Sequence, residues 1–260
     1  IQHESVHAID GWDDLRRRLQ PDRRCFAFFH PQLPAEPLIF VEVALVTAIS
    51  KEVGPLLDKK SESLDAKKFK TAIFYSISNC QPGLRGISLG NFLIKRVAEK
   101  ILQDIPSVKT FCTLSPVPGF NKWLDALPGS AALSTFEDKK GRLTNALQVL
   151  LREGDWTKRI AKGWLPSTAS PEEKAALMHL CFVYLTQCVH TASGDPVGKF
   201  HLANGAKLHD INWAGDLSKK GLAQSSAIMV NYLYELGSVE ENHERFIKRE
   251  VVFSRSLSSL

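Results

Sequence analysis

The segment between residues 71 and 101 restricts the possible folds more than any other part of the chain. It opens with Thr-Ala-Ile-Phe-Tyr-Ser-Ile-Ser (71–78), a run of β-branched and aromatic residues that is typical of a strand. A loop with three glycines follows, and from residue 89 apolar residues recur at the i, i+3 and i+4 spacing of a buried helix face. A second strand is predicted over 108–114. This order of strand, loop, helix and strand indicates an α/β domain.

The rest of the sequence also mixes strands and helices, which favours a mixed sheet with inserted helices. A short amphipathic helix with an apolar stripe is predicted over 12–19, and the basic run 16–18 is expected to face solvent. Ser170 and Glu173 form the capping box of a longer helix that is expected to end near residue 189. Further strands are predicted over 24–29, 38–47, 198–202, 207–213 and 227–234.

The glycine loop between the first strand and the helix has the features of an anion-binding site. Glycine lets the backbone approach a phosphate, and the free N–H groups at a helix start favour negative charge. The spacing is not G-x-G-x-x-G and lacks a G-K-[ST] ending, which disfavours dinucleotide and nucleoside triphosphate sites. It resembles the pyrophosphate loop of the acetyltransferase-like acyl-CoA fold, although a tight connection that simply needs glycine explains it equally well. The candidate phosphate-binding residues are Gln81, Gly83, Leu84, Arg85, Gly86, Ser88 and Gly90.

Two further residues are placed where ligands commonly bind. Ser115 follows the strand at 108–114 and precedes two prolines, so it is expected on a stiff turn at the ligand crevice of an open sheet. The context is not G-x-S-x-G, which argues against a conventional hydrolase, and a turn role is the commoner explanation for such a serine. His201 precedes the turn signal Asn204-Gly205 and is therefore predicted near a strand end. An isolated histidine is usually structural.

Composition excludes several classes of protein. The net charge of +5 is spread along the chain, with no basic patch interleaved with aromatics, so a nucleic-acid partner is not expected. The longest apolar run (37–49) contains Glu42 and is too short to cross a bilayer, so no membrane partner is expected. The five cysteines include no C-x-x-C pair, which indicates neither a zinc site nor a disulfide framework. They predict free, mostly buried thiols in a reducing, intracellular compartment.

Three blocks of sequence together resemble the malonyl-CoA decarboxylase family. The first is the strand at 71–78 with its glycine loop and Asn-Phe-Leu-Ile-Lys (91–95). The second is Leu-Ser-Pro-Val-Pro-Gly-Phe (114–120), and the third is Phe-His-Leu-Ala-Asn-Gly-Ala (200–206) with Ile-Asn-Trp (211–213). The blocks occur in family order, and Met-Val-Asn-Tyr-Leu-Tyr (229–234) extends the match. Their joint occurrence is far more specific than any single motif.

The resemblance implies an acetyltransferase-like (GNAT-like) acyl-CoA-binding domain over 1–237 and a C-terminal helix or tail over 238–260. It places catalytic roles on Ser115, His201 and Tyr234. Some family members have Glu where this chain has Ser88, so no catalytic carboxylate is expected there. Family members also carry an amino-terminal helical domain involved in oligomer formation, which is absent from these 260 residues. A homo-oligomer is expected in the full-length family context.

The implied reaction, in fatty-acid metabolism, converts malonyl-CoA to acetyl-CoA and CO2. Loss of CO2 leaves an enolate whose charge lies largely on the thioester oxygen, so the thioester is itself the electron sink. No pyridoxal, biotin or metal is therefore expected as a cofactor. Ser115 is expected to hydrogen-bond the malonyl group, while His201, with an ordinary pKa of about 6.5, is expected to act as donor and general acid. The reverse assignment of roles stays open.

Two other functions and three compartments stay open. An acyl-CoA N-acyltransferase on the same fold would use an amine acceptor, and a non-catalytic malonyl-CoA sensor would tolerate loss of His201. Cytoplasm is the predicted location, with peroxisome or mitochondrion as alternatives. The final residues Ser258-Ser259-Leu260 approach a peroxisomal S-K-L address but lack its basic middle residue, and a frayed polar tail is the preferred interpretation.

Overall fold

The computed structural model describes residues 4, 6–7, 9, 11–61, 63, 65–84, 90–128, 131–138, 141–152 and 154–260. Within this described part, seven strands form one mixed sheet in the order β1-β2-β3-β4-β7-β5, and β6 also pairs with β7. The strands are β1 (Arg23–His30), β2 (Leu33–Val46), β3 (Thr71–Asn79), β4 (Thr110–Thr113), β5 (Ser115–Pro116), β6 (Lys207–Asn212) and β7 (Met229–Tyr234). The predicted α/β domain with a mixed sheet is confirmed.

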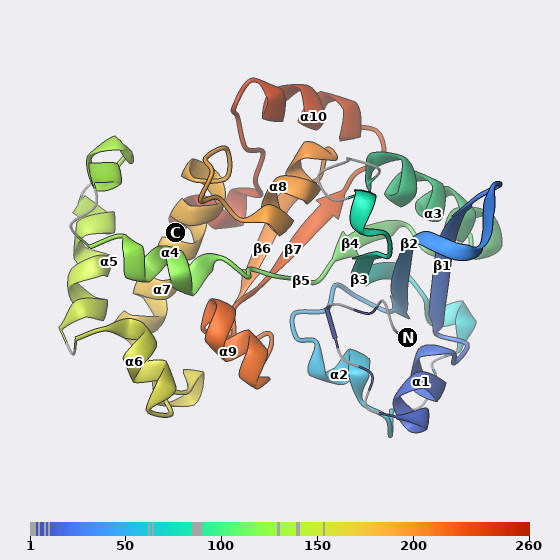
Figure 1. Ribbon diagram of the computed structural model, residues 1–260, viewed down its shortest axis with the longest axis horizontal. Coiled ribbons are helices and arrows are strands. Elements are labelled where there is room, and N and C mark those ends of the chain that lie inside the picture. Colours follow the sequence, from blue (N-terminus) through green and yellow to red (C-terminus); the bar gives the residue numbers. More distant parts are fainter. Residues whose placement is uncertain are drawn as a thin grey trace.

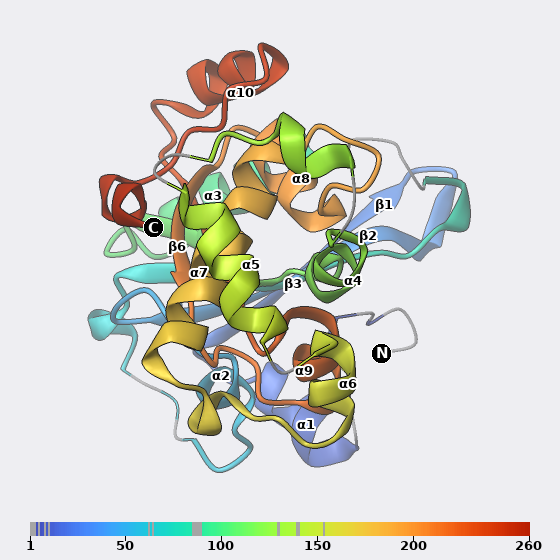
Figure 2. The ribbon, with the colours of Figure 1, turned by 90° about the vertical axis from the view of Figure 1, so that its left-hand side faces the viewer.

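The helices gather in three groups around this sheet (Figures 1 and 2). In Figure 1, α3, α8 and α10 lie above the sheet, α1, α2 and α9 lie below it, and α4 to α7 form a helical layer at one end. Their bounds are α1 (Trp12–Arg18), α2 (Gly54–Leu57), α3 (Gly90–Asp104), α4 (Phe120–Ala126), α5 (Arg142–Leu151), α6 (Trp156–Ala161), α7 (Pro171–Gln187), α8 (Pro196–Ala203), α9 (Lys219–Ser225) and α10 (Val239–Ile247). Short 3-10 turns occur at 66–68, 82–84, 131–135, 166–168 and 255–259.

The sheet combines antiparallel and parallel pairs of strands. β1, β2 and β3 form an antiparallel meander, and β3 then pairs in parallel with β4 after the chain crosses through α3. β7 runs antiparallel to β4, β5 and β6. β3, α3 and β4 form the strand, loop, helix and strand unit that the sequence predicts over 71–114. The strands predicted over 24–29, 38–47, 207–213 and 227–234 are confirmed as β1, β2, β6 and β7.

The core lies on both sides of the central strands. Val41, Val43 and Leu45 of β2 are fully buried, and β3 is buried along almost its whole length. The predicted apolar stripe of α3 is confirmed, since residues such as Leu93 and Val97 are buried against the sheet. A strand that is covered on both faces needs apolar residues at most positions, which explains the apolar run Ala-Ile-Phe-Tyr at 72–75. All five cysteines are free and four of them are buried, as predicted.

The first helix forms where predicted, but its buried face is the opposite of the expected one. Trp12 is 84% exposed and Leu19 is 68% exposed, whereas Arg17 and Arg18 are buried. Nearby carboxylates explain the difference, because Arg17 pairs with Asp22 of the following turn at 2.7 Å and Arg18 pairs with a β2 carboxylate at 2.6 Å. The prediction that the run 16–18 faces solvent is therefore wrong for its last two residues. Buried arginines persist where carboxylates pair with them.

The long helix near the middle of the chain follows its capping signal. Ser170 Oγ accepts from the Glu173 backbone N–H at 3.1 Å, and the Glu173 carboxylate accepts from the Ser170 N–H at 3.0 Å. This capping box starts α7, which packs on α5 and against β6. Residues 238–260, set apart in the sequence prediction, contain α10, which packs on α8. The division of the chain at residue 237 stays a prediction.

Candidate active site

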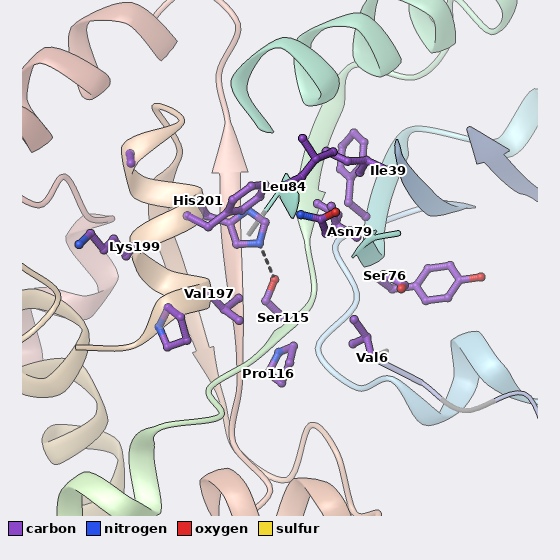
Figure 3. Close-up of a pocket in the computed structure, with 16 residues that line it drawn as sticks. Val6, Ile39, Ser76, Asn79, Leu84, Ser115, Pro116, Val197, Lys199 and His201 are labelled. Carbon is purple, nitrogen blue, oxygen red and sulfur yellow. Dashed lines mark hydrogen bonds between the residues drawn. The ribbon is translucent and has the colours of Figure 1, made fainter. Parts of the chain in front are cut away.

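A cavity of about 600 Å³ opens where β3 and β5 diverge. β3 pairs with β4 as far as Phe74 and Thr113, and the Leu114 N–H donates to the Phe74 carbonyl at 3.0 Å. The chain then turns away, because Ser115 pairs with Val230 of β7 instead. One wall of the cavity is the end of β3, another is β5, and a third is one side of α8 (Figure 3). This divergence places Ser115 at the crevice, as predicted.

Ser115 is held on the cavity wall by short contacts to two neighbours. The residue is 5% exposed, and its hydroxyl donates to Thr113 Oγ1 at 2.9 Å. On its other side, Ser115 Oγ lies 3.1 Å from His201 Nε2 (Figure 3). Thr113 is fixed in turn, because its hydroxyl oxygen also accepts the backbone N–H of Tyr232 at 3.1 Å. Pairing with β7 and these contacts define the position of the Ser115 hydroxyl oxygen.

His201 lies in α8, and the prediction of a strand end at 198–202 is wrong. Asp195 caps the helix through the Gly198 N–H at 2.8 Å, and Pro196 occupies the first turn. Asn204-Gly205, read from the sequence as a turn after a strand, instead ends this helix, with Gly205 at φ +77°. The helical setting points the imidazole across the cavity toward Ser115 (Figure 3).

Tyr234 completes a chain of hydrogen bonds behind the serine. Its hydroxyl lies 2.8 Å from His201 Nδ1, so the imidazole bridges Tyr234 on β7 and Ser115 on β5. The Ser115 proton is directed to Thr113, so His201 Nε2–H must donate to Ser115 Oγ and Nδ1 must accept from Tyr234. The structure thus brings together the three residues to which the resemblance assigned catalytic roles.

Burial sets the charge of these groups. The His201 side chain is 3% exposed, and desolvation lowers its pKa to about 3, so the expectation of an ordinary value near 6.5 is wrong for the unliganded protein. Burial likewise raises the pKa of Tyr234 well above its usual value. The imidazole ring of His201 also stacks on Tyr232, with 4.8 Å between ring centroids. Near neutral pH the chain of hydrogen bonds is therefore uncharged.

The predicted phosphate loop reaches the same cavity at one described residue. Leu84 lines the cavity wall (Figure 3), and Gly83 lies beside it in a 3-10 turn. The Gln81 side chain donates to the Pro37 carbonyl at 3.1 Å, so it ties the loop to β2. Gly90 is the first residue of α3. The remaining predicted residues, Arg85, Gly86 and Ser88, lie outside the described residues.

Sequence reasoning missed several polar residues that the structure places at or beside the site, among them Thr113 and Ser76. Thr113 orients the Ser115 hydroxyl, and strand alternation could have indicated it, since residues i and i+2 share a face of a strand. Ser76 lines the cavity from β3 and donates to the Glu4 carboxylate at 2.8 Å. A serine inside an otherwise apolar, buried strand was the signal for it.

Neither a metal site nor a membrane span is found in the described part of the chain. No group of three or more His, Cys, Asp and Glu among those residues has the arrangement of a metal site. Likewise, none of the described helices combines the length and apolar character that crossing a bilayer requires.

Comparison with known proteins decides the family. The sequence profile of the malonyl-CoA decarboxylase C-terminal domain matches residues 1–260. The chain belongs to the malonyl-CoA decarboxylase family. Among curated relatives, mitochondrial malonyl-CoA decarboxylase from Anser anser anser is 41% identical over 94% of this chain, and that from Rattus norvegicus is 36% identical over 99%. The match covers 50% and 54% of those two proteins, so the chain spans about half the length of these relatives.

Solved structures of the family share the fold. The malonyl-CoA decarboxylase of Rhodopseudomonas palustris is 43% identical with a TM-score of 0.83, over 100% of this chain and 62% of that one. The enzyme of Cupriavidus metallidurans is 40% identical with a TM-score of 0.81, over 98% of this chain and 62% of its own. The family resemblance noted from the sequence is thus confirmed over the whole chain.

Proposed function

We propose that this chain decarboxylates malonyl-CoA to acetyl-CoA and CO2, with Ser115 and His201 as the catalytic pair. The observation that carries the proposal is the hydrogen-bonded series Tyr234, His201 and Ser115 on the wall of a 600 Å³ cavity. Leu84 of the predicted phosphate loop lines the same cavity. Membership of the family supports the choice of substrate.

The charge of the site suits a reaction that consumes one proton. Malonyl-CoA brings a carboxylate into a buried site, and a nearby anion favours the charged form of histidine. We infer that His201 takes up a proton as substrate binds, so that the carboxylate is paired beside the buried imidazole. Carbon–carbon cleavage then releases CO2 and leaves its electron pair in the enolate. The substrate thus keeps one negative charge through this step, and protonated His201 stays beside it as the counter-charge.

Ser115 and His201 then act on the enolate. The Ser115 hydroxyl can turn from Thr113 to hydrogen-bond the thioester oxygen, where the negative charge collects. The imidazolium transfers its proton to the α-carbon, which yields acetyl-CoA and leaves the His201 imidazole neutral. A pKa of about 3 without substrate means that protonated His201 gives up its proton readily. Tyr234 holds the ring at Nδ1 throughout.

Several finer points belong to the same proposal. The thioester takes the electron pair, so the proposed mechanism uses no added cofactor. We expect a role in fatty-acid metabolism and a homo-oligomer in the full-length family context. The curated relatives from Anser anser anser and Rattus norvegicus are described as mitochondrial, which supports the mitochondrial alternative over the predicted cytoplasm.

The proposal is tested by following products from malonyl-CoA with mass spectrometry. The parent protein is expected to release acetyl-CoA, and the Ser115→Ala and His201→Ala variants to release little. Transfer of an acyl group to an added amine, without CO2, would indicate an N-acyltransferase. Tight binding of malonyl-CoA without any product would indicate a sensor.

A further inference from the structure

The carboxylate of Asp195 lies behind the active site with no exposure to solvent. One oxygen accepts the Gly198 N–H at 2.8 Å, which caps α8. The other oxygen accepts the Gly119 N–H at 3.3 Å, at the start of α4. A single side chain thus joins two segments that are 76 residues apart in the sequence.

These two segments carry the proposed catalytic pair. Gly119 lies in the turn between β5 and α4, four residues after Ser115, and Gly198 lies one helical turn before His201. Pro116 and Pro118 stiffen the connection from Ser115 to Gly119, because each fixes its own φ angle. A shift at either end of the Asp195 carboxylate is therefore transmitted to the serine or to the histidine.

Packing around the carboxylate leaves little room for movement. A Cβ at position 119 would lie 2.3 Å from the Tyr184 hydroxyl oxygen, so the backbone approaches this ring as closely as only glycine allows. A Cβ at Gly198 would lie 3.0 Å from the hydroxyl oxygen of Tyr232, the ring on which His201 stacks. Both segments that Asp195 joins are thus pressed against rigid aromatic side chains.

Helix capping alone does not explain such a buried acid. The exposed Asp155 caps α6 through the Lys158 N–H, which shows that a capping aspartate functions in contact with water. Burial of Asp195 raises the pKa of its carboxyl group to about 6, which reflects a desolvation cost that an exposed cap avoids. A second task that requires burial accounts for this cost.

We propose that Asp195 is a positioning residue that clamps the turn after Ser115 to the His201 helix and thereby sets the 3.1 Å contact of the catalytic pair. The inference rests on the proposed function, because it assigns Asp195 a part in that reaction. It acts through Ser115 and His201, and it touches neither substrate nor the reacting atoms.

The decisive variant is Asp195→Ser. Serine caps helices well and keeps an acceptor for Gly198, but its side chain is too short to reach Gly119 as well. Asp195→Asn is the size-matched second variant, since its amide nitrogen cannot accept the Gly119 N–H. Asp155→Ser is the control for an exposed cap. Because a misplacement of about 1 Å costs roughly 100-fold in rate, kcat of both Asp195 variants is expected to fall about 10- to 100-fold.

The pattern of kinetic constants separates positioning from general damage. KM for malonyl-CoA should change by no more than about threefold in the Asp195 variants, because the substrate contacts are kept. The Asp155→Ser control should keep the parental kcat. A parental kcat in folded Asp195→Ser would overturn the clamp, and so would a rise in KM with kcat unchanged.

A second readout separates failure of the clamp from failure of the proposed function. If the parent releases no acetyl-CoA, the proposed function fails, and the clamp is judged from the ¹⁵N NMR signals of the His201 ring. Signals of Asp195→Ser that move toward those of Ser115→Ala would show that the serine–histidine contact depends on Asp195. Signals identical to those of the parent would overturn the inference.

Discussion

The lowered pKa of His201 makes a quantitative prediction about stability. Its folded value is about 3, against about 6.5 in an unfolded chain, so the unfolded state binds more protons between these limits. The free energy of unfolding therefore loses a contribution from His201 as pH falls from about 6.5 toward 3. With these two values, linkage gives a loss of about 2 kcal/mol between roughly pH 7.5 and pH 5.

The assay compares the parent with His201→Gln, which does not titrate. Urea unfolding at a series of pH values gives the free energy of unfolding of each protein, and all other titrating groups cancel in the difference. The variant should gain about 2 kcal/mol relative to the parent as the pH is lowered from roughly 7.5 to 5. Parallel curves over that range would mean that folded His201 titrates with an ordinary pKa, and the buried, neutral imidazole described above would be refuted.

Three further outcomes are expected. Tyr234→Phe removes the hydrogen bond to the imidazole, so steady-state assays should show kcat reduced about tenfold or more while KM changes little. Arg18→Ala leaves the buried Glu42 carboxylate without its arginine partner and should lower the free energy of unfolding in urea by about 3 kcal/mol. The exposed control Arg16→Ala should change that free energy by less than about 0.5 kcal/mol. Gly119→Ala places a methyl group 2.3 Å from the Tyr184 hydroxyl, so calorimetry should show a lower Tm, and an unchanged Tm would contradict this packing.

Short-range sequence patterns correctly predicted those elements that depend mainly on residues close together in the sequence. The strand, loop and helix over 71–104 followed from β-branched residues, glycine spacing and an apolar stripe, because each of these acts over a few residues. The capping box at Ser170 likewise needed only residues within one helical turn. Such signals are reliable when no neighbouring signal competes with them.

The segment around His201 shows how competing signals mislead. Asn204-Gly205 suits both a hairpin turn and the end of a helix, and the preceding Asp195-Pro196 decides between them because that pair starts helices well. In α1 the apolar stripe predicted the wrong buried face. There the carboxylates that draw Arg17 and Arg18 inward come partly from another element, which no helical pattern reveals.

The site itself could be predicted only through the family resemblance. Ser115 and His201 are 86 residues apart, and Tyr234 follows His201 by 33, so no spacing rule joins them. Their contact depends on the divergence of β3 from β5 and on the packing of α8 above that gap. The low pKa of His201 depends on the same packing, because burial by distant segments is its cause.

Single-turnover decarboxylation of malonyl-CoA tests the central claim most directly. The parent, Ser115→Ala, His201→Gln and the double variant would each be mixed in excess with substrate, and acetyl-CoA would be followed in time. Residues that act as one unit are non-additive, so the double variant should be about as slow as the slower single variant. No acetyl-CoA from the parent, or a double variant slowed by the product of the two single effects, would contradict a serine–histidine pair in decarboxylation.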